Sequence, residues 1–313
     1  MGWKSVLGSF LLLILIFGTI GMVFVYFFFP LNPIDFVSDF NSDAHLNSNF
    51  SLNSSIAAEM QFYNNMRYVS SEVSYKIDEN CNLKRKDDMT RAFKMLEEKT
   101  ILRFYPVLNN EEISINCSDE VITNKQYFIA GEGGPTEIVR TPNFDVILTG
   151  KILLLSDSKC ERPNVALHEL LHALGFDHSE NPSNILYRIS DCKQILGEDI
   201  PQAINTLYSI PSKPDLTFSD VSAKMHSRYL DINVTIQNQG LQDAPISKII
   251  IYADNKKVKE QDLAEVKIGY ELTMLFQNIL ISQLNVQEIT VEIEASFDEI
   301  EKSNNKIKLK VKE

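Results

Sequence analysis

The spacing of hydrophobic and polar positions changes along the chain and predicts its elements. Residues 5–29 carry no charged side chain and consist mainly of Leu, Ile, Val and Phe. At a rise of about 1.5 Å per residue, a helix of this length can cross a hydrocarbon core about 30 Å thick. We therefore expect a transmembrane signal-anchor at 5–29, preceded by a short cytoplasmic end at 1–4. A cleaved signal peptide is the alternative.

The pattern becomes mixed after this segment. Residues 30–60 are rich in Asn and Ser and predict a flexible linker. Over 61–212 helical and strand spacing alternate, as is typical of a mixed α+β domain. Strands are predicted at 67–77, 101–107, 113–117, 146–148 and 152–155, and helices at 84–99 and 198–209. The glycine-rich range 131–145 predicts a surface loop near a sheet edge.

A strand pattern dominates beyond a short proline-containing linker at 211–214. Apolar residues alternate with polar ones from Leu230 to Ile236, as in a half-buried strand. Similar runs recur at 248–252, 272–276, 289–295 and 306–311. The sequence therefore predicts an Ig-like β-sandwich over 213–313. The expected α+β chain has an N-terminal transmembrane helix, a mixed twisted sheet with helices, and this sandwich.

One short segment of the central domain carries three of the five histidines. Residues 168–178 read H-E-x-x-H-x-x-G-x-x-H. His168 and His172 are four residues apart, so on a helix they share a face and can bind one Zn²⁺. Gly175 can adopt the left-handed conformation that ends a helix, after which the chain can turn back and supply His178. Three protein ligands leave one position open, as in catalytic zinc sites.

Glu169 is the predicted general base of this site. It follows the first histidine and can accept a proton from the attacking water instead of binding the metal. The helix also has an apolar stripe at Leu167, Leu170, Leu171 and Leu174 that predicts its buried face. The alternative is a helix whose histidines are ordinary core or surface residues. Chance alone would rarely add the glycine and the third histidine at these offsets.

This motif resembles that of the metzincin zinc peptidases at every fixed position. Ser179, directly after the third histidine, is similar to the matrixin branch. These peptidases have a methionine-containing turn below the zinc, and N-I-L-Y at 184–187 resembles it with Leu186 in the methionine position. Some members have a metal-facing tyrosine two places after the methionine. Arg188 stands there, so Tyr187 is not assigned as a ligand.

The resemblance implies a zinc-dependent endopeptidase with one catalytic Zn²⁺ ion and a protein or peptide substrate. It leaves the presence of a structural Ca²⁺ ion unknown. In this family a strand before the zinc helix forms the sheet edge that holds the substrate in extended form. Residues 214–216, 237–240 and 299–305 resemble a cell-adhesion-related (CARDB-like) Ig-fold module. Such a module is interpreted as a spacer or as a substrate- or envelope-binding domain.

Four cysteines follow the N-terminal apolar segment. An even number in an oxidising compartment favours two disulfides, for which three pairings are possible. Cys160 precedes the zinc helix and Cys192 follows the turn at 184–187, so a bridge between them would clamp the active-site loop. We predict this bridge together with Cys81–Cys117. Free buried thiols are the alternative.

The charged residues of the chain indicate its expected location and partners. The net charge is −12 and no basic patch is present, which argues against a nucleic-acid partner. Lys4 precedes the apolar segment, while Asp35, Asp39 and Asp43 follow it. We therefore expect a single-pass protein of the cell membrane, contacting the bilayer through 5–29, with both domains extracytoplasmic. The oligomeric state is unknown.

A second function of another class fits the same domains. A catalytically inactive adhesion or envelope-binding protein would use the C-terminal sandwich and need no general base. Glu169 is intact. The sequence therefore favours the peptidase.

Overall fold

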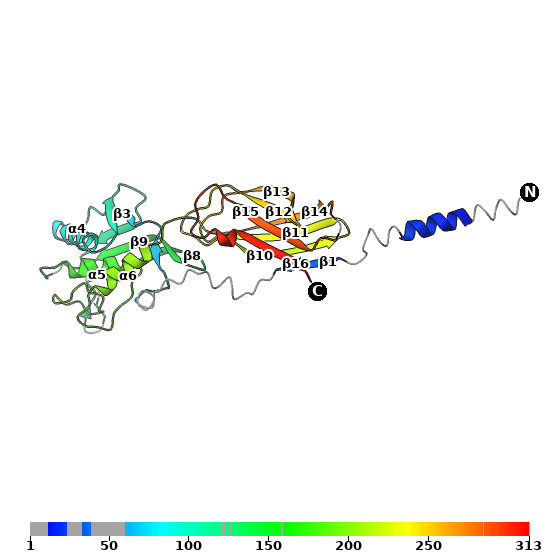
Figure 1. Cartoon of the computed structure of the whole chain (residues 1–313). Coiled ribbons are helices and arrows are strands. Elements are labelled where there is room, and N and C mark those ends of the chain that lie inside the picture. Colours follow the sequence, from blue (N-terminus) through cyan, green and yellow to red (C-terminus); the bar gives the residue numbers. More distant parts are fainter. Residues whose placement is uncertain are drawn as a thin grey trace, which may run out of the picture.

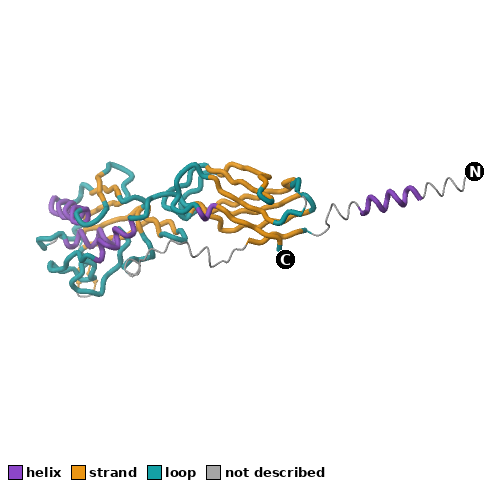
Figure 2. The backbone as a smooth tube through the Cα atoms, in the orientation of Figure 1, coloured by secondary structure: helices purple, strands orange, loops and turns teal. Residues whose placement is uncertain are grey.

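The computed structural model describes residues 12–23, 33–38, 60–120, 123–124, 127–157, 159–283 and 285–312. An α/β unit and a β-sandwich lie end to end (Figure 1). Among the described residues, helices lie in the α/β unit and at 12–23, apart from one short 3₁₀ turn (Ser303–Asn305) in the sandwich (Figure 2).

The expected transmembrane helix requires a correction. Residues 12–23 form a helix with exposed side chains. No helix in the described ranges is long and apolar enough to cross a membrane. The prediction of a transmembrane helix is therefore wrong, although the remainder of 5–29 lies outside the described residues.

A strand replaces part of the predicted flexible linker. β1 (Ile34–Ser38) pairs antiparallel with two strands of the sandwich, β10 (Leu216–His226) and β16 (Lys306–Val311). Phe36 is 3% exposed and belongs to the sandwich core. The alternation of Ile34, Asp35 and Phe36 directs apolar side chains to one face, as a half-buried strand requires. Residues 39–59 lie outside the described part of the chain.

The α/β unit contains a sheet of order β2-β9-β5-β3-β4, with β8 paired to β9. Its strands are β2 (Arg67–Tyr68), β3 (Glu72–Ile77), β4 (Arg103–Pro106), β5 (Ile113–Cys117), β8 (Gly131–Arg140) and β9 (Asp145–Leu154). Two short strands, β6 (Thr123–Asn124) and β7 (Tyr127–Phe128), pair separately. Its helices are α4 (Leu83–Glu97), α5 (Asn164–Ala173) and α6 (Asp199–Tyr208). Only β8 runs antiparallel to its neighbour in the main sheet.

β8 lies where a surface loop was predicted. Gly131, Gly133 and Pro135 are poor strand formers, which explains the prediction from local composition. The strand forms because it pairs with β9 from Gly131 opposite Leu154 to Arg140 opposite Asp145. The predicted strands 146–148 and 152–155 belong to the single strand β9, which ends at Leu154. Long-range pairing therefore overrides the local signal here.

One apolar core joins the sheet to all three helices of the α/β unit. It includes Met89 and Phe93 of α4, Leu167 and Leu171 of α5, and Ile204 of α6. The predicted helical stripes are therefore buried against the sheet. This core fixes α5, which carries the histidines, against strands β8 and β9.

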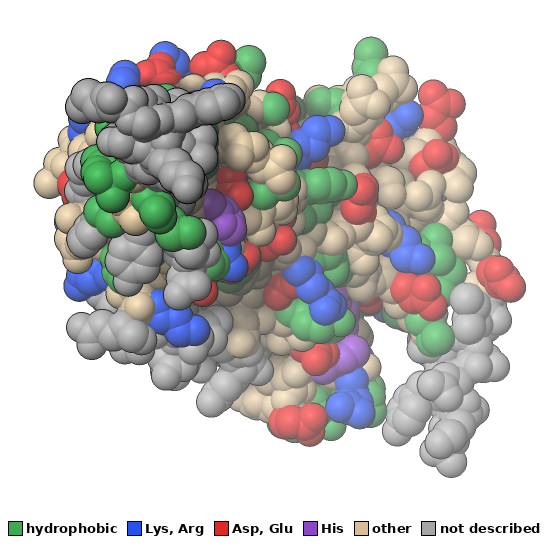
Figure 3. Space-filling model, turned by 90° about the vertical axis from the view of Figure 1, so that its right-hand side faces the viewer, with side chains coloured by type: hydrophobic (Ala, Val, Ile, Leu, Met, Phe, Trp, Pro, Cys, Tyr) green, Lys and Arg blue, Asp and Glu red, His purple; other side chains and the backbone are tan. Residues whose placement is uncertain are grey.

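The sandwich consists of antiparallel strands in the order β13-β12-β15-β16-β1-β10-β11-β14. Its remaining strands are β11 (Tyr229–Asn238), β12 (Ser247–Ala253), β13 (Lys256–Leu263), β14 (Glu271–Leu280) and β15 (Glu288–Glu294). β10 and β13 were not predicted from the sequence. β13 is a charged, mostly exposed edge strand, so it lacks the apolar alternation that marks its neighbours. On the described part of the face in Figure 3, acidic and basic side chains are interspersed.

Candidate active site

Helix α5 ends in a conformation that glycine allows. Asn164 is its first residue, after Pro163, and Gly175 has a φ of +93°. A Cβ at Gly175 would lie 2.6 Å from Cγ of Met66, so space and backbone both require glycine. The chain turns back after this point, as predicted.

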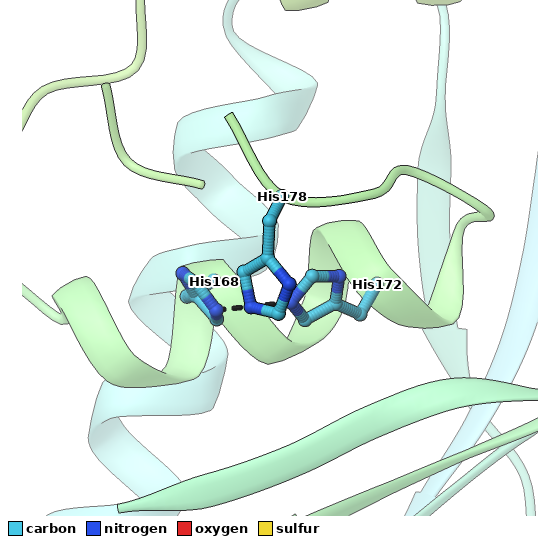
Figure 4. Close-up of side chains that lie close together, drawn as sticks. All are labelled: His168, His172 and His178. Carbon is cyan, nitrogen blue, oxygen red and sulfur yellow. Dashed lines mark hydrogen bonds between the residues drawn. The ribbon is translucent and has the colours of Figure 1, made fainter. Parts of the chain in front are cut away.

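His168 and His172 are oriented by backbone carbonyl groups. Nδ1 of His168 lies 2.7 Å from the oxygen of Ile185, and Nδ1 of His172 lies 2.7 Å from the oxygen of Phe176. A carbonyl oxygen can only accept, so each Nδ1 carries a proton and donates it. In the neutral rings the lone pairs are therefore on Nε2, and the two Nε2 atoms lie 2.9 Å apart (Figure 4).

His178 completes a three-histidine cluster. Its ring lies 4.6 Å from that of His172 and 5.4 Å from that of His168, centroid to centroid. One ring nitrogen from each histidine lies within 4.8 Å of the others. Nitrogens on a tetrahedral zinc ion at about 2.0–2.1 Å are separated by roughly 3.4 Å. Facing lone pairs this close suit a shared cation, so the cluster fits a zinc ion.

Burial keeps these imidazoles in the form that binds metals. It lowers the pKa of His168 to about 4, with a further contribution from His172. Burial also lowers the pKa of His172 and of His178. All three rings are therefore neutral near pH 7, which leaves a lone pair on each for a metal.

Glu169 packs beneath the edge strand β8. It is 5% exposed, and burial, followed by the nearby charge of Glu132, raises its pKa to about 8. A Cβ at Gly131 would lie 2.8 Å from Cγ of Glu169, and one at Gly133 would lie 2.2 Å from its backbone oxygen. The two glycines therefore allow β8 to approach the helix, a role that the sequence reasoning missed. Their alternate spacing in G-E-G-G was the available signal.

A short segment before β2, Met60–Phe62, lies along the other side of the cluster. The N–H of Asp177 donates to the oxygen of Met60 at 2.9 Å, and that of Phe62 donates to the oxygen of Gly175 at 3.0 Å. The Phe62 ring stacks on His172, with centroids 5.8 Å apart. We call this segment the strap. Nothing in its own residues predicts this position.

Leu186 is buried in a turn whose neighbouring residue Ile185 contacts His168. It is 0% exposed and belongs to the same core as α5. Its N–H donates to Oδ1 of Asn184 at 2.9 Å, and its carbonyl accepts from the N–H of Ser179 at 3.0 Å. The adjacent Ile185 supplies the carbonyl that orients His168. Arg188 is exposed and pairs with Glu180 at 3.3 Å.

Both predicted disulfide bridges are present. Cys160–Cys192 connects the segment before α5 to the segment after the Leu186 turn. Cys81–Cys117 joins the residues before α4 to the end of β5. No cysteine is free.

Family comparisons agree with this geometry. Residues 60–185 match the model of the astacin family of peptidases, and residues 213–308 match that of the CARDB domain. The protein is a zinc metalloendopeptidase of the metzincin type. The astacin match supports the metzincin resemblance, while the matrixin-like feature at Ser179 stays a prediction from the motif. The CARDB match agrees with the expected C-terminal module.

Wider comparisons add little to the metzincin assignment. No match was found among curated proteins. One solved structure with similarity is a solution NMR structure of the 272–376 domain of a provisionally named cell surface protein from Methanosarcina acetivorans. It is 20% identical, covers 32% of this chain and 93% of that chain, and has a TM-score of 0.28. A likeness this low supports no functional conclusion.

Proposed function

We propose that this metalloendopeptidase acts outside the cytoplasm, with His168, His172 and His178 as zinc ligands and Glu169 as general base. The observation that carries the proposal is the convergence of three neutral imidazoles, two on helix α5 and one on the loop after it, next to the buried carboxylate of Glu169. When bound, zinc supplies a Lewis acid that polarises the attacking water and the peptide carbonyl.

Glu169 moves the proton in this proposal. Its carboxylate accepts a proton from the attacking water and later returns it to the leaving amine. Burial favours the neutral form of Glu169. A cation held by the neighbouring histidines would favour the charged form that a base needs.

The open edge of β8 can bind the substrate backbone. The N–H of Leu155 donates to the oxygen of Ala130 at 2.9 Å, so the backbone groups of Ala130 face β9. Backbone direction alternates along a strand. Gly131 and Gly133 therefore direct their backbone groups to the open edge. An extended peptide can pair with these groups, as in other strand-addition complexes.

The disulfides support an extracytoplasmic location. All four cysteines of the chain are bridged. Such bridges persist in oxidising compartments and are rare in the cytosol. Thiol labelling of denatured protein, isolated from its native host without reductant, tests this location. Labelling of all four cysteines would contradict it.

Substitution of Glu169 tests the proposed mechanism. Glu169→Gln should retain zinc and the fold but lower turnover about 10²–10⁴-fold, because only the proton acceptor is removed. Glu161→Gln, the same change at an exposed position before α5, is the matched control. Peptide-library cleavage with and without a chelator, combined with elemental zinc analysis, provides the measurement. Wild-type turnover by Glu169→Gln would refute the mechanism, and a zinc-loaded wild type without any cleavage would favour the adhesion function.

A further inference from the structure

A small apolar cluster joins the peptidase unit to the sandwich. Phe144 and Val146, at the β8–β9 hairpin, are 1% and 0% exposed. Ile210, directly before the linker, and Leu241 and Ile268 of the sandwich complete the cluster and are at most 8% exposed. Full burial of these side chains requires both units. The linker is thus part of a packed junction.

The linker is also fastened by polar contacts. Arg67 of β2 is 1% exposed and donates from Nη1 to the oxygen of Leu207 at 2.6 Å and to that of Ile210 at 3.0 Å. The hydroxyl of Ser212 donates to the oxygen of Val69. A buried guanidinium needs such acceptors, so a displacement of residues 207–210 would cost Arg67 two of its hydrogen bonds. These contacts favour one fixed arrangement of the two units.

Gly269 of the sandwich contacts the far end of β8. Its φ is +73°, and a Cβ there would lie 2.5 Å from Cγ1 of Val139 and 3.0 Å from the oxygen of Arg140. The sandwich backbone therefore lies directly against the last residues of β8. In Figure 1 the β8 end of the peptidase unit faces the sandwich.

β8 connects this contact to the catalytic helix. It pairs with β9 from Gly131 to Arg140, with register shifts between Pro135 and Ile138, and its first residues, Gly131 and Gly133, lie on Glu169. Ten strand residues extend about 33 Å. A displacement of the hairpin at Gly269 can therefore be transmitted along a hydrogen-bonded strand to the general base.

The hairpin also contacts the segment that continues from the strap. Cζ of Arg140 lies 4.6 Å from the ring centroid of Tyr63, and Nδ2 of Asn65 donates to the oxygen of Asn143 at 3.0 Å. Tyr63 directly follows Phe62, whose ring stacks on His172. The hairpin that contacts the sandwich thereby also reaches a metal ligand, through the strap.

We propose that the C-terminal sandwich is a positioning element of the active site. The loop at Gly269 holds the β8–β9 hairpin, and the hairpin holds both the substrate edge over Glu169 and the strap against His172. The proposal rests on the proposed peptidase function, because it assigns the sandwich a part in that reaction. Gly269 is a positioning residue and does not contact the substrate.

The test is a double-mutant cycle in the full chain. Gly269→Ala adds a methyl group against Val139 and Arg140, and should lower kcat/KM about tenfold for a long peptide while zinc content stays unchanged. The kcat/KM for a short peptide that contacts less of β8 should fall by a smaller factor. A lower fraction of folded enzyme would instead reduce kcat/KM equally for both peptides. Adding Val139→Ala removes the nearest atom and should restore part of the loss. If Gly269→Ala does not fold, Ile268→Ala removes apolar contact without adding an atom and serves instead.

Ile251→Ala is the matched control for sandwich stability. Ile251 is 0% exposed in the sandwich core and belongs to β12. This variant should lower the unfolding midpoint of the sandwich yet keep wild-type kcat/KM below that midpoint. Wild-type kinetics in Gly269→Ala, or an equal loss in Ile251→Ala, would overturn the positioning role. A zinc-loaded wild type without Glu169-dependent cleavage would instead refute the proposed function.

Discussion

Two adjacent glycines of β8 offer a direct test of its contact with the zinc helix. A Cβ at Gly133 would lie 2.2 Å from the backbone oxygen of Glu169 and 2.8 Å from its carbonyl carbon. A Cβ at Gly134 would meet nothing within 4 Å. Gly133→Ala therefore perturbs the contact between β8 and Glu169. Gly134→Ala makes the same chemical change in the same strand but leaves this contact undisturbed.

The size of the effect follows from the overlap. Ordinary contact begins at 3.4 Å, so the new methyl group forces β8 and α5 apart by roughly 1.2 Å. Displacements of about 1 Å around a reacting centre cost about 10²-fold, and overpacking costs about 1–3 kcal/mol. We expect Gly133→Ala to lose about 100-fold in kcat/KM and about 1–3 kcal/mol in the free energy of unfolding. Gly134→Ala should change this free energy by less than about 1 kcal/mol.

Peptidase kinetics, zinc content and urea unfolding of the two variants provide the measurements. Zinc should remain bound in both variants, because the carbonyl groups that orient His168 and His172 belong to Ile185 and Phe176, outside β8. Equal kcat/KM for Gly133→Ala and Gly134→Ala would refute the reasoning, since it would show that β8 does not rest on Glu169 in the active enzyme.

Three further predictions concern the floor of the site, its disulfide and the sandwich. Leu186→Ala should cost about 2–5 kcal/mol and weaken zinc binding, whereas Leu186→Met should cost less than about 1.5 kcal/mol; equal thermal midpoints would contradict this. Serine at both Cys160 and Cys192 opens a bridge of sequence separation 32. The free energy of unfolding, measured in urea without reductant, should fall by about 3–4 kcal/mol. An unchanged free energy would show that the bridge does not stabilise the fold. Burial raises the pKa of Asp215 from 3.8 to about 6. Ionisation of Asp215 therefore costs more free energy in the folded state than in the unfolded state. The free energy of unfolding consequently falls as the pH rises from about 4 to about 6. Asp215→Asn should gain stability relative to wild type across that window in urea unfolding, and a pH-independent difference would rule this out.

The zinc-binding segment could be predicted because local geometry determines it. His168 and His172 are one helical turn apart, and Gly175 ends the helix at a φ of +93°. His178 follows in the loop after this glycine, three residues on, and joins the cluster. The turn at Leu186 was found only through its resemblance to the family, because its position depends on hydrogen bonds to residues outside it.

β8 could not be predicted because its stability comes from other segments. Its glycines lower strand propensity, yet they are what permits the approach to Glu169. Local composition thus predicts a loop at the place where the close packing of helix and strand requires glycine. The position of the strap could not be predicted for a similar reason. Phe62 lies against His172 because the strap is hydrogen-bonded to the distant residues Gly175 and Asp177.

The N-terminal strand shows the same limit at the longest range. Residues 34–38 are too few to distinguish a strand from a polar linker by pattern alone. Their partner strands, β10 and β16, are themselves brought together only when the sandwich folds. Without β1, these two strands would present unpaired edges and the core would lose Phe36. The sandwich therefore needs residues from both ends of the chain, and a domain boundary drawn at 213 by pattern omits one of its strands.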